Sequence, residues 1–161
     1  MALRLVCDAA NDLHCVLRAC GHAAGRYENV RAALAQAEPG DGLLLLADAY
    51  PAAAQEIDPD ALAAAADKGC KAYVEFPAAL PGRTLGAPRE ITVERGVVAS
   101  DAFAPALEPG RILTLHGCRY VPAEAAAPHL VLARVAGFDR AVFGIPADAQ
   151  PVLFEAAPRL L

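Results

Sequence analysis

The chain has 161 residues, of which 56% are hydrophobic and 20% are charged, and this composition excludes an intrinsically disordered protein. The net charge is −5 and the 14 lysine and arginine residues form no run, which disfavours nucleic-acid binding through a basic face. No apolar stretch approaches the roughly 20 residues of a membrane span, and residues 1–6 lack the layout of a secretory signal. We therefore expect one cytoplasmic domain over residues 1–161, with neither nucleic-acid nor membrane partners.

The first predicted elements are a strand and two helices. Residues 3–7 form the strand, which ends at Asp8. A helix follows from residue 11 or 12, because four side chains recur at the helical spacing i, i+3, i+4, i+7, namely Leu13, Val16, Leu17 and Cys20. A second helix is predicted over residues 28–37, and the glycine- and proline-rich residues 38–42 form a turn.

A strand, a helix and another strand are predicted next. The apolar run at residues 43–47 is typical of a strand that is covered by helices on both faces. Asp58 as N-cap, Pro59 at the first helical position and Gly69 after the last turn mark the helix. Residues 71–76 form the second strand. Such a unit implies parallel strand pairing with a right-handed crossover.

From about residue 89 the pattern changes to short segments that glycine and proline separate. Their β-branched content predicts strands, several of them antiparallel, at residues 90–94, 97–99, 111–115, 130–135, 141–145 and 152–155. Residues 137–140 predict a hairpin turn between two of these strands. The sequence therefore predicts an α/β layer followed by a β-rich section.

Polar and aromatic residues follow the strands of the predicted parallel sheet. A ligand, if there is one, should bind at the carboxyl edge of these strands, near Asp8, Asn11, Asp48, Tyr50 and Phe76. There Asp8 and Asp48 would favour a cation or a hydroxyl-rich ligand, or would act as an acid/base pair. The alternative is that both aspartates, like Glu75 at the next strand end, cap turns or helix starts. We favour this alternative over catalysis because it is the commoner use of aspartate.

The cysteines and histidines give no second site. The five cysteines are scattered, which fits reduced thiols better than a disulfide framework, and we expect Cys7 and Cys70 to be buried. The spacing Cys-x4-Cys-x-His at residues 15–22 matches no standard zinc pattern, so we expect no metal site and no cofactor. His116 and Cys118 could form a nucleophile–base pair only if folding brought another group near them. The catalytic residues, if any, stay unassigned.

Three segments resemble a known family. The segments DGLLLLADAYP (41–51) and DPDALAAAADKGCKAYVEF (58–76) resemble class I glutamine amidotransferase-like domains. The segment HLVLARVAGFDRAVFGIP (129–146) is similar to a later section of such domains, in the form found beside bacterial glycoside hydrolases. The resemblance implies an α/β fold: a flavodoxin-like, largely parallel sheet with a β-rich C-terminal extension.

The resemblance also implies a missing nucleophile. Active amidotransferases carry a cysteine in a Gly-x-Cys-x-Gly elbow just after the strand that corresponds to residues 73–76, whereas this chain continues Phe76-Pro77-Ala78-Ala79. We therefore expect a non-catalytic amidotransferase-like domain that binds, assembles or supports a carbohydrate-active module, or forms a homo-oligomer. The alternative is a small hydrolase that uses acidic residues at strand ends or the His116/Cys118 pair. An enzyme should bring these groups together in one pocket, whereas an accessory domain should show an exposed apolar face.

Overall fold

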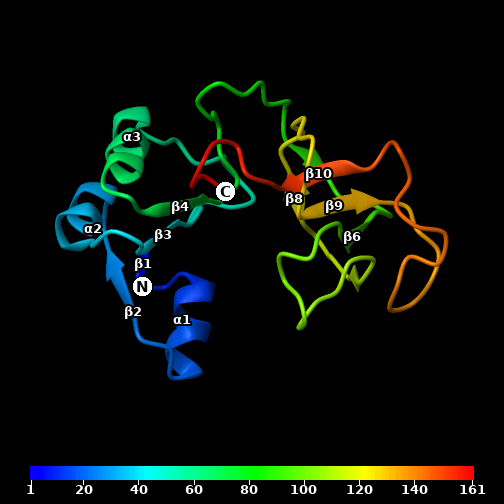
Figure 1. Ribbon diagram of the computed structural model, residues 1–161, viewed down its shortest axis with the longest axis horizontal. Helices are drawn as coiled ribbons and strands as arrows, with labels where there is room; N and C mark the ends of the chain where they lie inside the picture. The colour runs from blue at the N-terminus through cyan, green and yellow to red at the C-terminus, as the bar shows by residue number, and fades with distance from the viewer. The chain divides into compact units, whose positions relative to one another are not determined.

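The computed structural model describes all 161 residues, which cluster into two compact units (Figure 1). Unit 1 comprises Met1–Pro81 and Ala157–Leu161, and unit 2 comprises Gly82–Ala156. The chain passes from unit 1 to unit 2 after Pro81, and the first strand of unit 2 begins at Arg89, where the β-rich section was predicted to begin. A single domain over residues 1–161 stays a prediction. None of the helices combines the length and the apolar character that crossing a membrane requires.

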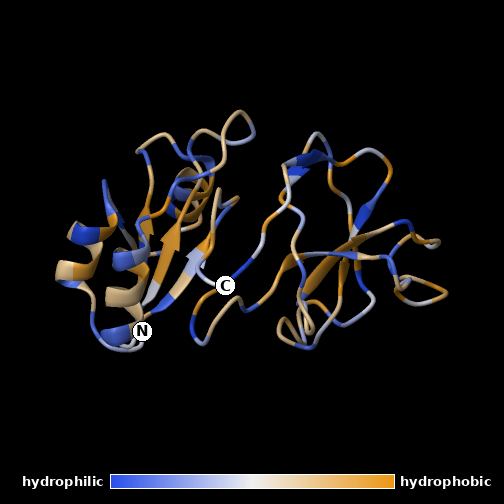
Figure 2. Cartoon of the chain, turned by 90° about the horizontal axis from the view of Figure 1, so that it is seen from above, coloured by the Kyte–Doolittle hydropathy of each residue, from blue (hydrophilic) through white to orange (hydrophobic).

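Unit 1 is a four-stranded parallel sheet with three helices. Its strands lie in the order β2-β1-β3-β4, and every neighbouring pair is parallel. The elements in chain order are β1 (Leu3–Val6), α1 (Asp12–Ala19), β2 (Ala24–Tyr27), α2 (Val30–Gln36), β3 (Gly42–Leu45), α3 (Pro59–Asp67) and β4 (Lys71–Val74). Figure 2 shows the strands of this sheet as largely apolar ribbons, beside helices whose colouring is mixed. The parallel α/β layer is thus confirmed.

The predicted strand–helix–strand unit is present as β3, α3 and β4. The side chain of Asp58 accepts a hydrogen bond from the backbone N–H of Asp60 at 3.0 Å, and Pro59 is the first helical residue. Gly69 closes the helix with φ +78°, a conformation that glycine adopts without a Cβ penalty. The residues at its two ends therefore determine where this helix begins and ends, and the strands on either side pair in parallel as expected.

The prediction missed strand β2. This strand has only one neighbour, β1, and its residues are half-buried or exposed. Its sequence, Ala-Gly-Arg-Tyr, lacks both the apolar run of a covered strand and a clear alternation. An edge strand needs neither signal, because only one of its sides is held by the sheet.

The last residues of the chain extend the sheet beyond β4. The backbone N–H of Ala72 donates to Arg159 O, and that of Leu161 donates to Ala72 O, both at 2.8 Å. The N–H of Val74 in turn donates to Leu161 O. Residues 159–161 therefore form a short parallel segment beside β4, and Leu160 is buried there.

Unit 2 consists of antiparallel strands, as the β-rich pattern predicted. One sheet has the order β10-β9-β6-β7, and β5 pairs with β8 in a separate ladder. The strands are β5 (Arg89–Glu90), β6 (Arg95–Val98), β7 (Ile112–Leu113), β8 (Arg119–Tyr120), β9 (Leu130–Ala133) and β10 (Gln150–Leu153). Its core is formed by Val97, Val131 and Ala133, which are packed together and buried.

Two predicted strands of unit 2 are wrong. Of the predicted strand 90–94, only residue 90 lies in a strand, and residues 91–94 form a bend before β6. Residues 141–145 contain a turn and no strand, so residues 137–140 are not a hairpin turn between two strands. Backbone bonds hold this segment instead, since Ile112 N–H donates to Asp139 O at 2.8 Å and Ala141 N–H donates to Gly110 O at 2.9 Å. The guanidinium of Arg95 also donates to the carbonyls of Val135 and Gly137. Apolar β-branched residues here face solvent rather than a core, which explains why the sequence pattern misled.

Candidate functional site

The carboxyl edge of β1 and β3 brings three of the predicted residues together. The carboxylate of Asp48, just after β3, accepts the backbone N–H of Asp8 through Oδ2 at 2.7 Å. Its Oδ1 accepts the side-chain Nδ2 of Asn11 at 2.8 Å. These residues meet where neighbouring strands send their connections in different directions, the position at which open parallel sheets place ligands.

Asn11 connects Asp48 to helix α1, because its side chain bonds both. Its side-chain Oδ1 accepts the backbone N–H of His14 at 3.3 Å, which makes it the N-cap of the helix. His14 is itself buried, and its Nδ1 lies 3.2 Å from the carbonyl oxygen of Ala9. The loop between β1 and α1 is thus tied to the end of β3 at one side and to the helix at the other.

The two predicted aromatic residues form a separate contact. The rings of Tyr50 and Phe76 meet edge to face, with centroids 5.0 Å apart and an interplanar angle of 89°. Phe76 is buried and has φ +45°, a left-handed conformation that is rare for a bulky residue. Its carbonyl accepts the backbone N–H of Gln55 at 2.8 Å, and Gln55 Oε1 is a buried oxygen without a hydrogen-bond partner. The chain therefore makes a sharp, constrained turn directly after β4.

Two of the three acidic residues of this edge, Asp48 and Glu75, accept hydrogen bonds from protein N–H groups through their carboxylates, whereas Asp8 takes part through its backbone N–H. Both oxygens of Asp48 are occupied in this way, and Glu75 Oε2 accepts the backbone N–H of Ala47 at 2.9 Å. This arrangement is the capping role that sequence analysis favoured for Asp48. The protein contains no group of three or more His, Cys, Asp or Glu side chains that could hold a metal ion.

The cysteines add no nucleophile to the edge. All five are free thiols, and Cys7 and Cys70 are buried, as expected. Burial raises the pKa of the Cys7 thiol, and the nearby charge of Asp48 raises it further. Because the thiolate is the nucleophile, a raised pKa lowers the reactivity of Cys7. In unit 2, Cys118 Sγ lies 3.4 Å from the backbone oxygen of His116, a contact with the backbone that leaves the imidazole out.

No family model, curated protein or solved structure matches this chain. The residues themselves therefore have to carry any functional assignment.

Unit 2 contains a serine–histidine contact that the sequence did not predict. Ser100 Oγ lies 2.8 Å from His129 Nδ1, and the rings of His129 and Phe103 make an edge-to-face contact with centroids 6.3 Å apart. The Ser100 hydroxyl also accepts the backbone N–H of Ala102 at 3.3 Å, as a serine that caps a turn does. The pair lies 29 positions apart in the chain, and no local pattern marks it.

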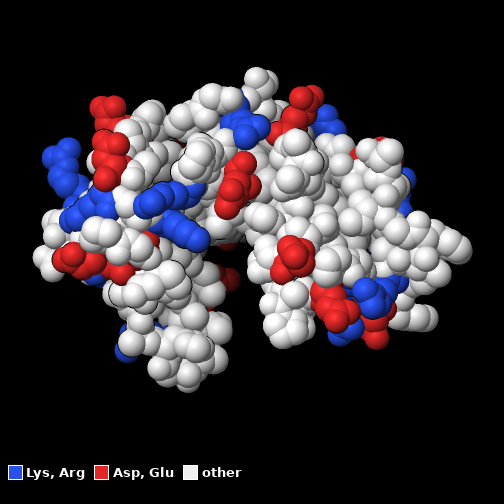
Figure 3. Space-filling view, viewed as in Figure 1, with Lys and Arg blue, Asp and Glu red and all other residues white.

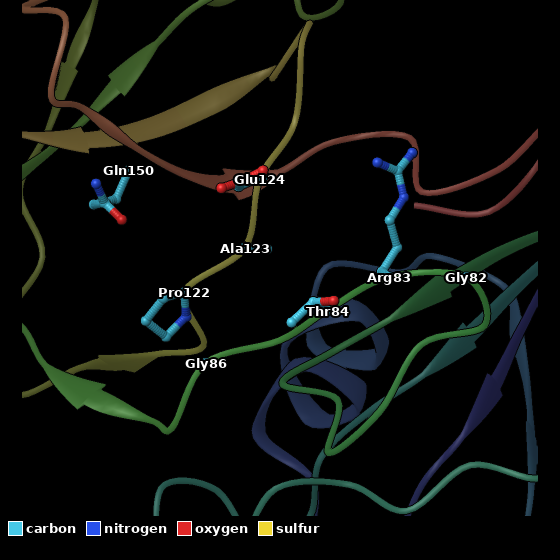
Figure 4. Close-up of a pocket in the computed structure, with 8 residues that line it drawn as sticks. All are labelled: Gly82, Arg83, Thr84, Gly86, Pro122, Ala123, Glu124 and Gln150. Atoms are coloured by element: carbon cyan, nitrogen blue, oxygen red, sulfur yellow. The ribbon is translucent and has the colours of Figure 1, made fainter.

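Two cavities were also not predicted from the sequence. One, of about 600 Å³, lies in unit 2 between residues 82–86, 122–124 and Gln150 (Figure 4). The other, of about 570 Å³, lies in unit 1 between the start of α2 and the start of α3. Each is assembled from segments far apart in sequence, so no single motif announces it.

The Asp48 contacts give a direct test of the capping role. We expect Asp48→Ala to lower the free energy of unfolding by about 1–2 kcal/mol, because two hydrogen bonds to a partly exposed carboxylate are lost. Amide hydrogen exchange should quicken in residues 8–14, which these bonds hold. Asp67→Ala is the matched control, since that exposed carboxylate has no hydrogen-bond partner. If amide exchange in residues 8–14 were equally fast in both variants, the two hydrogen bonds to Asp48 would not be what holds this loop.

Proposed function

We propose that this chain is a non-catalytic, amidotransferase-like domain that binds, assembles or supports a carbohydrate-active module. The order of its strands supports a flavodoxin-like sheet. Strands β2-β1-β3-β4 follow the order 2-1-3-4-5 of that fold, and residues 159–161 occupy the fifth position as a parallel segment.

The observation that carries the proposal is the conformation of Phe76. Amidotransferase-like elbows need a residue held at strained backbone angles directly after this strand, because that conformation projects the nucleophile. Phe76 has φ +45° at that position and is buried against Tyr50. A phenyl ring has no nucleophilic atom, and Pro77 and Ala78 supply none either. A sharp turn without a nucleophile at this position is the arrangement that a non-catalytic amidotransferase-like domain would have.

An exposed apolar surface in unit 2 supports the accessory role. Phe138 and Phe143 are 97% and 89% exposed, and Val142 and Ile145 in the same loop are also exposed. This apolar loop, residues 136–146, is held by backbone bonds and by Arg95, so its apolar side chains are presented on an ordered segment. It lies in the orange part of the chain at the right of Figure 1, where Figure 3 shows a mostly uncharged surface. Ordered apolar patches of this kind mark interaction sites.

The small-hydrolase alternative has less support. The carboxylates of Asp48 and Glu75 already accept hydrogen bonds from backbone and side-chain N–H groups. The thiol of Cys118 contacts the backbone oxygen of His116 and not its imidazole. A general base needs a free acceptor near the reacting proton, and a nucleophile needs a base beside it.

The test measures association of the full chain with a purified catalytic module of a bacterial glycoside hydrolase. We expect calorimetric binding, which the double variant Phe138→Ser/Phe143→Ser should weaken by about tenfold or more. Exposed aromatic residues are frequent hot spots, and tenfold corresponds to about 1.4 kcal/mol. The control is Val93→Ser, which removes another exposed apolar side chain of unit 2 from a different segment.

Two results would overturn the proposal. One is the absence of binding by the unmodified chain at protein concentrations of about 100 μM, well above the Kd of a specific transient complex. The other is ammonia release from glutamine that disappears in Cys118→Ala, since it would show an active amidotransferase with a nucleophile elsewhere.

A further inference from the structure

The cavity of unit 2 is lined by four polar side chains together with Pro122, Ala123 and two glycines. Arg83 and Thr84 come from the segment that opens the unit, Glu124 from the segment after β8, and Gln150 from the start of β10. Figure 4 shows these four side chains spread around the cavity, with Pro122 and the backbone of Gly86 between them. The volume of about 600 Å³ falls in the range of small-molecule sites.

Backbone contacts hold the two walls of the cavity in place. The N–H of Gly86 donates to the carbonyl of Pro122 at 2.8 Å, and Leu85 and Ala123 form an antiparallel bridge. A Cβ built on Gly86 would lie 3.1 Å from Pro122 Cβ, so glycine permits this close approach. The cavity is therefore formed before any ligand arrives.

The side chains that line the cavity have hydrogen-bond donors and acceptors that are not used within the protein. Arg83 donates from Nε and Nη2 to the carbonyl oxygen of Ala156, at 3.0 and 2.8 Å, so its Nη1 group remains available as a donor. Gln150 donates Nε2 to Asp148 O at 3.0 Å, which leaves Oε1 as an acceptor. The hydroxyl of Thr84 and the carboxylate of Glu124 have no partner in the protein.

The charges of the lining cancel. A phosphate or carboxylate would gain from Arg83 but would face the unpaired carboxylate of Glu124, and a cation would meet the reverse situation. An apolar molecule would strip water from four polar groups without replacing their hydrogen bonds. Each hydroxyl group both donates and accepts, so a molecule with several hydroxyls can donate to Glu124 and Gln150 and accept from Arg83 and Thr84.

We propose that this cavity binds a neutral, hydroxyl-rich molecule of the hexose class. The inference is independent of the proposed accessory function, because it rests on the lining of one cavity and not on the resemblance or on the apolar loop.

The experiment is saturation-transfer difference NMR, with affinities from titration, on the full chain. The probes are glucose, galactose and mannose, with glucose 6-phosphate and glucuronate as charged analogues of the same ring. We expect at least one neutral hexose to bind with a Kd of about 1–10 mM, and its charged analogue to bind at least about fivefold more weakly. Glu124→Ala should weaken the binding of the neutral hexose about tenfold. Glu124→Gln should reduce the difference in affinity between the neutral hexose and its charged analogues, because it removes the repulsion between the two negative charges.

The control variant is Glu90→Ala, which removes an exposed carboxylate of unit 2 that does not line the cavity. Circular dichroism verifies that each variant is folded. The proposal is overturned if no hexose binds saturably up to about 50 mM, far above the expected Kd. It is equally overturned if the charged analogues bind more tightly than the neutral ones, or if Glu124→Ala and Glu90→Ala give the same affinity.

Discussion

Leu45→Ala is expected to lower the free energy of unfolding of unit 1 by about 2–5 kcal/mol, which is the cost of removing a large side chain from a close-packed core. Leu45 is 1% exposed and lies on β3, one of the two inner strands of the sheet. Its partners in register are Val6 on β1 and Val74 on β4, and both are buried. The sheet backbone on both sides limits how far the surroundings can collapse into the resulting cavity.

Chemical denaturation followed by circular dichroism measures this loss. Leu13→Ala is the matched control, because Leu13 lies on α1 with 38% of its surface exposed and should cost less than about 1 kcal/mol. A Leu45→Ala cost no larger than the control would show that β3 is not the centre of the unit.

The parts of the fold that sequence reasoning recovered are those with local physical signals. Asp58, Pro59 and Gly69 fix a helix within one short segment, and the apolar run of β3 fixes a covered strand beside it. Parallel pairing of β1 and β3 then places Asp8 and Asp48 at one edge, which required only the direction of the strands. These steps need no knowledge of distant contacts.

The parts that sequence reasoning did not recover depend on distant contacts. Strand β2 exists because β1 pairs with it, although its own residues carry no strand pattern. The segment 141–145 has the composition of a strand, but it forms no strand ladder with a neighbour, and Val142, Phe143 and Ile145 stay exposed. The cavity of unit 2 combines residues from positions 82–86, 122–124 and 150, so its chemistry exists only once the backbone has folded.

The conformation of Phe76 lies between these cases. The sequence showed that no nucleophile follows β4, but the left-handed turn at that place could not be read from a phenylalanine, a residue that avoids positive φ. Tertiary contacts impose it, through the hydrogen bond from Gln55 to its carbonyl and the packing of its ring on Tyr50. Strained positions of this kind persist only where the surroundings overdetermine them.

Asp41→Asn is expected to remove much of the acid sensitivity of unit 1. Asp41 is buried at the amino-terminal edge of the sheet, where Oδ1 accepts Ala2 N–H at 2.7 Å and Oδ2 accepts Glu38 N–H at 3.1 Å. The guanidinium of Arg4 also donates to Oδ2, from Nη2 at 2.8 Å and from Nε at 3.0 Å. The backbone N–H groups, followed by Arg4, lower the pKa of Asp41 from 3.8 to about 2.

The sign of the effect follows from that depression of the pKa. A carboxyl group whose pKa is lower in the folded state binds protons more readily when unfolded, so its ionised form stabilises the fold. The stabilisation is fully present above about pH 4 and is lost as the pH falls from 3.8 towards about 2. Denaturant titrations between pH 7 and pH 2 should therefore show a steep fall in unit 1 stability that is shallower in Asp41→Asn, which is also less stable at pH 7 because Arg4 loses its carboxylate. Asp67→Asn, an exposed site without such bonds, should keep the slope of the unmodified chain. An unchanged slope in Asp41→Asn would show that other carboxylates govern the acid transition.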